Sequence, residues 1–172
     1  MPSRPQQPSA ATRLPLLDAA RSLAEGREQP AARHRLVYQI VGGPPGKRFE
    51  RTLVIAGDGS TRFEVRDDMA VEAGRRVDAT LPRERVQELF RDLVDSRLFE
   101  NVEAGGGFVP DSMVGIITFD DGTRAFSYYF PTDADTARRA EQSRQLNPSL
   151  QRMIAALEDI VRGLQAGNEL GA

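Results

Sequence analysis

Two short turn motifs, Asp58-Gly59 and Asp120-Asp121-Gly122, constrain the fold of this chain most. The first lies between the apolar residues 53–55 and residues 63–65, and the second joins residues 114–119 to residues 124–130. An Asp-Gly turn between two segments in which apolar and polar residues alternate is typical of a β-hairpin. We therefore expect two antiparallel hairpins, and a type I′ turn at Asp58-Gly59 in which both residues have positive φ.

Further strands are expected before and after the first hairpin. Residues 35–41 alternate with a period of two, and the Gly- and Pro-rich residues 42–46 separate them from the next extended segment, 49–56. Residues 77–79 allow a short additional strand. The sequence therefore predicts about five strands in one antiparallel sheet.

Helical spacing of apolar residues appears in three places. Residues 12–25, residues 80–100 and the segment that follows Asn147-Pro148 each have one apolar stripe, and Pro82 stands where a first helical turn tolerates proline. Residues 133–145 have helical propensity but few apolar side chains, which predicts an exposed helix or excursion. The predicted fold is α+β, with two amphipathic helices packed on one face of the sheet and an additional N-terminal helix.

The expected organisation is a single domain with short extensions. We assign a disordered tail to residues 1–11, a helix and linker to residues 12–30, one α+β domain to residues 31–166 and a C-terminal tail to residues 167–172. The N-terminal helix is too short to persist alone in water, so it docks either on its own domain or on a partner. The linker-like composition around Pro30 leads us to favour the partner.

The order of elements over residues 35–162 resembles small uncharacterised bacterial α+β domains built from a hairpin, a helix, a second hairpin and a last helix. The matching stretches are Val54-Ile55-Ala56-Gly57-Asp58-Gly59, Leu89 to Phe99, Asp111 to Tyr129 and Leu150 to Val161. This resemblance implies a fold and no particular activity. The strand order is also similar to that of small bacterial metalloprotease inhibitors, which keeps inhibition among the expected functions.

Composition excludes several kinds of chemistry. The 172 residues include no cysteine and one histidine, His34, so disulfides, thiol nucleophiles and ordinary Cys/His zinc sites are excluded. There is no apolar run of the length, about 18 residues, that a membrane span needs, and no signal-peptide pattern. We expect a cytoplasmic protein that uses no cofactor, no metal ion and no membrane.

Three motifs that suggest chemistry are explained more simply by structure. Residues 42–48 resemble a phosphate-binding loop, but Val41 and Arg48 stand where that motif needs glycine and Ser or Thr. His34 lies between two arginines at a strand start, where we expect a solvated side chain without a catalytic role. The paired aspartates fit turns and helix caps rather than a calcium loop.

The strand alternation places Arg62 and Arg66 on the face opposite Phe63, which argues against stacking of nucleic-acid bases on this sheet. Net charge is +3 over residues 31–76 within a total of −2, a modest basic region that can steer an acidic partner. Tyr128 and Tyr129 point to opposite faces at the end of the last strand.

We expect a non-enzymatic protein-interaction module that acts as a regulator, an inhibitor or an accessory subunit of a larger assembly. It would use the outer sheet face, the Gly105–Gly107 loop and the N-terminal helix. The candidate contact residues are Leu16, Leu17, Leu23, Arg62, Arg66, Tyr128 and Tyr129. The first alternative is a small ligand-binding or enzymatic domain that uses Arg and carboxylate side chains, and the second is nucleic-acid binding.

Overall fold

A computed structural model describes residues 10–44, 46–68, 74–100, 113–132 and 148–167. These residues form one six-stranded antiparallel sheet, in the strand order β4-β3-β2-β1-β5-β6, and three α-helices. The elements are α1 (Ala10–Ala24), β1 (Arg35–Gly42), β2 (Phe49–Ala56), β3 (Ser60–Asp67), β4 (Arg75–Thr80), α2 (Arg83–Asp95), β5 (Met113–Asp120), β6 (Ala125–Thr132) and α4 (Pro148–Gln165). The α+β prediction is confirmed, with six strands in place of about five.

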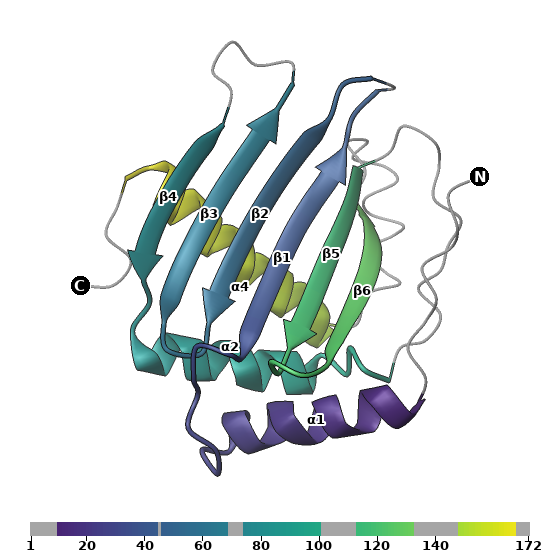
Figure 1. The fold of residues 1–172 in the computed structure, drawn as a ribbon, viewed down its shortest axis with the longest axis vertical. Coiled ribbons are helices and arrows are strands. Elements are labelled where there is room, and N and C mark those ends of the chain that lie inside the picture. The colour runs from purple at the N-terminus through teal and green to yellow at the C-terminus, as the bar shows by residue number, and fades with distance from the viewer. Residues whose placement is uncertain (1–9, 45, 69–73, 101–112, 133–147, 168–172) are drawn as a thin grey trace.

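One helix covers a face of the sheet and the other two lie along one end of it (Figure 1). α4 crosses behind the strands, α2 runs across the end where β4 finishes, and α1 lies against α2 on the side away from the sheet. Alternate residues of the strands face these helices and form the core, as the burial of Leu36, Leu53 and Phe63 shows. The other face of the sheet is covered by none of the described helices (Figure 1).

Both predicted hairpins form, but the turn between β2 and β3 is not type I′. Gly59 donates its N–H to the Ala56 carbonyl over 2.9 Å and has a φ of +92°, whereas Asp58 is not among the residues with positive φ. Asp58 instead accepts a hydrogen bond from the Ser60 N–H through its carboxylate. This is the geometry of a type I turn followed by a left-handed glycine. A Cβ on Gly59 would lie 2.5 Å from the Leu81 carbonyl oxygen, so this position requires glycine.

The N-terminal helix is part of the domain, and its interpretation as a free arm for a partner is corrected. Leu16 and Leu23 have no exposed surface and Leu17 is 8% exposed, because α1 packs against α2 and also contacts β6. The apolar stripe expected from the sequence is therefore present in α1, and it packs against other elements of the same chain. Leu14, on the other side of α1, is the large apolar side chain left exposed in the part of the chain that the structure describes, at 63%.

His34 is buried, contrary to the solvated side chain expected from its arginine neighbours. Its exposed fraction is 1%, and its Nδ1 accepts a hydrogen bond from the Ala31 N–H over 3.1 Å. Residues 31–34 pack against the β2–β3 turn. The Gly57 N–H donates to the His34 carbonyl, and a Cβ on Gly57 would lie 2.6 Å from the Ala31 carbonyl oxygen. Close backbone packing at a glycine thus buries this ring, a contact that local sequence does not reveal.

Several predictions concern residues outside the described ranges. These are the helix or excursion at residues 133–145, the Gly105–Gly107 loop, most of the tail at residues 1–11 and all but Gly167 of the tail at residues 167–172. The short strand expected at residues 77–79 is confirmed as β4, and the helices expected at residues 80–100 and after Asn147 are confirmed as α2 and α4.

Candidate interaction surface

The face of the sheet turned away from the helices is the candidate functional surface, and we call it the open face. It consists of the side chains that alternate with the core residues on all six strands. The pairing of Arg62 with Val54, Val54 with Val37 and Val37 with Thr118 traces one row across it. Because the rows are set by strand register, the chemistry of the open face follows directly from which residues lie opposite one another.

One half of the open face, on β2, β3 and β4, is charged and internally paired. Arg62 and Arg76 both donate to the Asp78 carboxylate, over 3.0 and 2.9 Å, and Arg76 lies 4.0 Å from Glu64. These hydrogen bonds hold the pKa of Asp78 below its ordinary value. Exposed pairs of this kind add little stability, because water and salt screen them. Their main consequence is that most charge on this half is already neutralised.

The other half of the open face has more aliphatic side chains and fewer charged ones. Five partly exposed aliphatic side chains lie across β2, β1 and β5, with Gln39 among them opposite Thr52 and Ile116, and we call them the apolar patch: Val37, Val41, Val54, Val114 and Ile116. Val41 lies opposite Val114, and Val37 lies opposite Val54. Ile116 lies opposite Tyr129 of β6, which extends the patch toward that edge. Aliphatic side chains on a face that no described helix covers are typical of an interaction surface.

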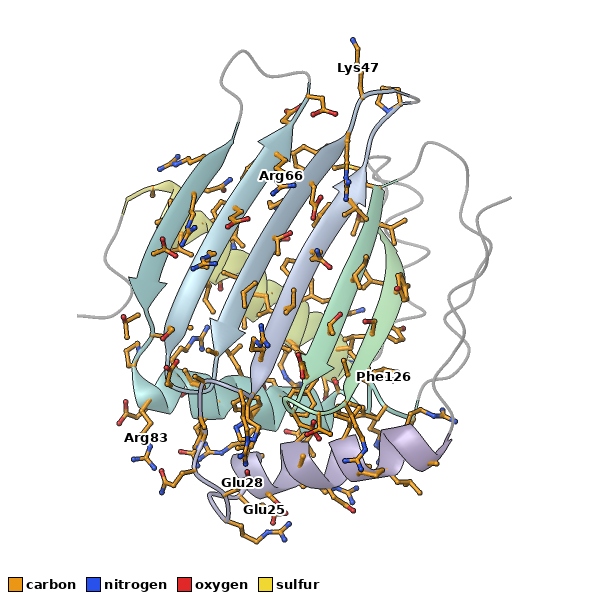
Figure 2. All side chains as sticks on the ribbon, in the orientation of Figure 1. Glu25, Glu28, Lys47, Arg66, Arg83 and Phe126 are labelled. Atoms are coloured by element: carbon orange, nitrogen blue, oxygen red, sulfur yellow. The ribbon has the colours of Figure 1, made fainter. Side chains whose placement is uncertain are left out.

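Two cations without an ion pair among the described residues lie toward one end of the sheet (Figure 2). Lys47 projects from the loop between β1 and β2, and Arg66 lies on β3 in the row that also contains Glu50 and Val41. Glu50 is paired with Arg48 over 2.7 Å. Neither Lys47 nor Arg66 forms an ion pair with another described residue. Glu50 lies between Arg66 and Val41 in that row, and Asp68 accepts a hydrogen bond from the Arg48 N–H, so this end of the sheet carries both cations and carboxylates.

The structure brings together only some of the residues proposed from the sequence. Arg62, Arg66 and Tyr129 lie on the open face, as the alternation predicted. Tyr128 is 6% exposed and faces the helices, so it is part of the core. The three leucines of α1 are also core residues. Sequence reasoning missed the apolar patch, although residues 36–41, which are apolar except for Gln39, and residues 113–117 are a signal that both faces of those strands carry apolar side chains.

A polar cluster lies on the opposite, helix-covered face. The Tyr38 hydroxyl donates to Glu158 of α4 over 2.5 Å, and Arg51 of β2 donates to the same carboxylate oxygen over 2.5 Å. The Tyr38 ring also stacks on Phe130, with 6.4 Å between centroids. The cluster ties α4 to the two central strands, because a buried hydroxyl that loses its acceptor is costly. Burial and the neighbouring Glu158 carboxylate raise the pKa of Tyr38 well above its ordinary value.

This raised pKa predicts a loss of stability in alkali. The folded protein holds the Tyr38 proton more tightly than the unfolded chain, so the contribution is complete below about pH 10 and declines as the pH rises above it. Burial also raises the pKa of Tyr128, which adds to the same loss of stability in alkali. The free energy of unfolding, measured with denaturant between pH 8 and pH 11, should fall as the pH rises. It should fall less steeply with pH for Tyr38→Phe than for the parent. An equal slope in the variant would contradict the assignment.

No group of three or more His, Cys, Asp or Glu side chains is placed to hold a metal ion within the described ranges. None of the described helices is both long and apolar enough to cross a membrane. Comparison of the sequence with protein-family models and with curated proteins found no match.

Proposed function

We propose that this protein is a non-enzymatic interaction module, acting as a regulator, inhibitor or accessory subunit, and that a protein partner docks on the open face. The observation that supports the proposal most is the apolar patch, whose five aliphatic side chains remain partly exposed while the opposite face of the same strands is covered by helices. A sheet face with apolar side chains gains free energy when another layer covers it.

The chemistry of the charged half favours a protein over a nucleic acid. Arg62 and Arg76 are both engaged with Asp78, so they offer fewer free charges to phosphates than the sequence count suggests. Nucleic-acid affinity depends mainly on neutralising phosphates with unpaired Lys and Arg side chains. An apolar patch beside self-paired charges instead matches the arrangement of protein interfaces, which have an apolar centre and a polar rim.

Changing Ile116 to aspartate should abolish partner capture and leave the fold intact. Ile116 lies in the apolar patch and is partly exposed, so a carboxylate there is tolerated in the free protein but is buried unpaired in a complex. The experiment replaces Val41 with a photo-crosslinking amino acid and irradiates the cells that naturally produce the protein. The wild-type background should give a discrete adduct, and the Ile116→Asp background should not.

The matched control is Arg152→Asp, because Arg152 is exposed on α4, on the helix-covered side of the sheet. It should leave the adduct unchanged. Thermal unfolding of all three proteins would verify that the folded fraction is the same. The proposal would be rejected if Ile116→Asp and Arg152→Asp gave the same crosslinking yield as the parent.

A further inference from the structure

His34, the one histidine of the chain, is buried in the connection between α1 and β1, outside the six strands of the sheet. We infer that His34 is an acid-sensitive latch. In its neutral form the ring holds residues 31–34 against the β2–β3 turn, and its protonation releases them. This inference does not depend on the proposed function, because the latch is separate from the open face.

The contacts of the ring determine which of its nitrogens has the hydrogen. The Ala31 N–H donates to Nδ1 over 3.1 Å, so Nδ1 has no hydrogen in the neutral ring. A neutral imidazole has one N–H group, which is therefore at Nε2. Nε2 lies 3.3 Å from a carboxylate oxygen of Glu28, which accepts this hydrogen. A second proton then binds at Nδ1, the position to which the Ala31 N–H already points.

A proton at Nδ1 would place two N–H donors against each other. The backbone of Gly57 prevents the Ala31 N–H from turning away, since a Cβ on Gly57 would lie only 2.8 Å from the Ala31 nitrogen. Two further hydrogen bonds hold the same residues: the Gly57 N–H donates to the His34 carbonyl over 2.7 Å, and the His34 N–H donates to the Ala31 carbonyl over 2.9 Å. Protonation therefore leaves a buried donor without an acceptor unless residues 31–34 move away from the turn.

The two charged side chains at Nε2 oppose each other. The Glu28 carboxylate favours a protonated ring, whereas the Arg33 guanidinium, with its Nε 3.4 Å from Nε2, disfavours it. These two side chains are also paired with each other over 2.5 Å, and the arginine is 63% exposed, so water screens the pair. The main difference between the two protonation states is thus the lost Ala31 hydrogen bond.

The charged groups of the neighbouring elements already have partners. In the β2–β3 turn, Asp58 accepts a hydrogen bond from the Ser60 N–H, and on α2, Arg83 donates to Gln29. In the β5–β6 hairpin, whose Gly122 packs on Arg33, the aspartates pair with Arg35 or accept backbone hydrogen bonds: Asp120 and Asp121. A pH effect on the latch in the neutral to mildly acidic range is therefore assigned to His34.

Acidification from pH 7.5 to pH 5.5 should open the latch. An imidazole in water binds a proton near about pH 6.5, and the opened segment behaves in this way, whereas the closed latch keeps Nδ1 without a proton. The open population relative to the closed one should rise about tenfold over this range. The stabilisation by the latch is complete above about pH 7.5 and is lost as the pH falls.

Hydrogen exchange of the full-length protein measures this opening. The protection factor of the Ala31 amide, which already corrects for the pH dependence of intrinsic exchange, should fall about tenfold between pH 7.5 and pH 5.5. Nitrogen-15 NMR of the imidazole gives a second readout, and the one histidine gives one set of ring signals. At pH 7.5 these signals should show a hydrogen on Nε2 and none on Nδ1.

Two variants identify the titrating group. His34→Asn is the matched variant, because a carboxamide oxygen at the position of Nδ1 accepts the Ala31 N–H and does not titrate in this range. Its Ala31 protection should be the same at both pH values. Glu28→Gln removes the carboxylate that favours a protonated ring, so the fall in protection should be at least as steep as in the parent. Thermal unfolding checks the folds of both variants.

Several outcomes would overturn the latch. It is wrong if Ala31 protection in the parent is the same at pH 7.5 and pH 5.5, or if NMR places the hydrogen on Nδ1 at pH 7.5. An equal fall in His34→Asn would show that another group titrates, and loss of the fall in Glu28→Gln would identify that group as Glu28. If His34→Asn does not fold, the NMR of the parent and the Glu28→Gln exchange decide.

Discussion

Replacing Phe119 with alanine should lower the free energy of unfolding by about 3–5 kcal/mol. Phe119 of β5 has no exposed surface and meets the rings of Phe90 and Phe99 edge to face, at 5.9 and 6.0 Å between centroids. The change removes a large apolar side chain, two aromatic contacts and the filling of a closely packed site. Urea denaturation followed by circular dichroism measures the loss.

Val114→Ala is the matched control on the same strand. Val114 is partly exposed on the open face, so the change should cost less than about 1 kcal/mol, because little buried surface is lost. Equal losses for the two variants would mean that the faces of β5 are assigned the wrong way round.

Replacing Leu23 with alanine should lower the free energy of unfolding by about 2–5 kcal/mol, a much larger effect than that of Leu14→Ala in the same helix. Leu23 has no exposed surface in the packing of α1 against the domain, whereas Leu14 of the same helix is 63% exposed. Leu14→Ala should therefore change the free energy of unfolding by less than about 0.5 kcal/mol, and both variants keep a good helix former. Chemical denaturation of the two variants makes the comparison.

Deletion of residues 1–29 extends the same test. The truncated protein should melt at a lower temperature and self-associate, because the deletion uncovers the side of α2 that α1 now buries. A truncated protein as stable as the parent would restore the interpretation of α1 as an arm for a partner and would contradict its placement in the core.

The sequence predicted most of the fold because its signals are local. Alternating residues around Asp58-Gly59 and Asp120-Asp121-Gly122 specify the hairpins, and the apolar stripes specify the helices. The docking of α1 could not be predicted in this way. An apolar stripe such as Leu16, Leu17 and Leu23 shows that a helix must be covered, but not by which chain. The burial of His34 likewise depends on Gly57, more than 20 residues away in sequence.

The candidate surface was predicted in part. Alternation alone placed Arg62 and Arg66 on the outer face, since a one-residue change of register would have put them in the core. The apolar patch depends instead on the order of strands. Val41 and Val114 adjoin only because β5 pairs with β1, and a pairing between segments so far apart is not visible in either segment. By contrast, Ile116 lies beside Tyr129 through the β5–β6 hairpin, a local pairing that the sequence does predict.

The packing of α1 has a consequence for how the chain is synthesised. α1 is the first described element to be made, yet it contacts β6, which begins at Ala125, 101 residues after α1 ends at Ala24. Ribosomes add about 5–20 residues per second, so the buried leucines of α1 wait about 5–20 s for that contact. The central β1–β5 pair is formed late for the same reason. Synthesis therefore leaves an apolar helix and a half-built sheet uncovered until the last quarter of the chain emerges, a period in which the nascent chain is open to aggregation or to chaperone binding.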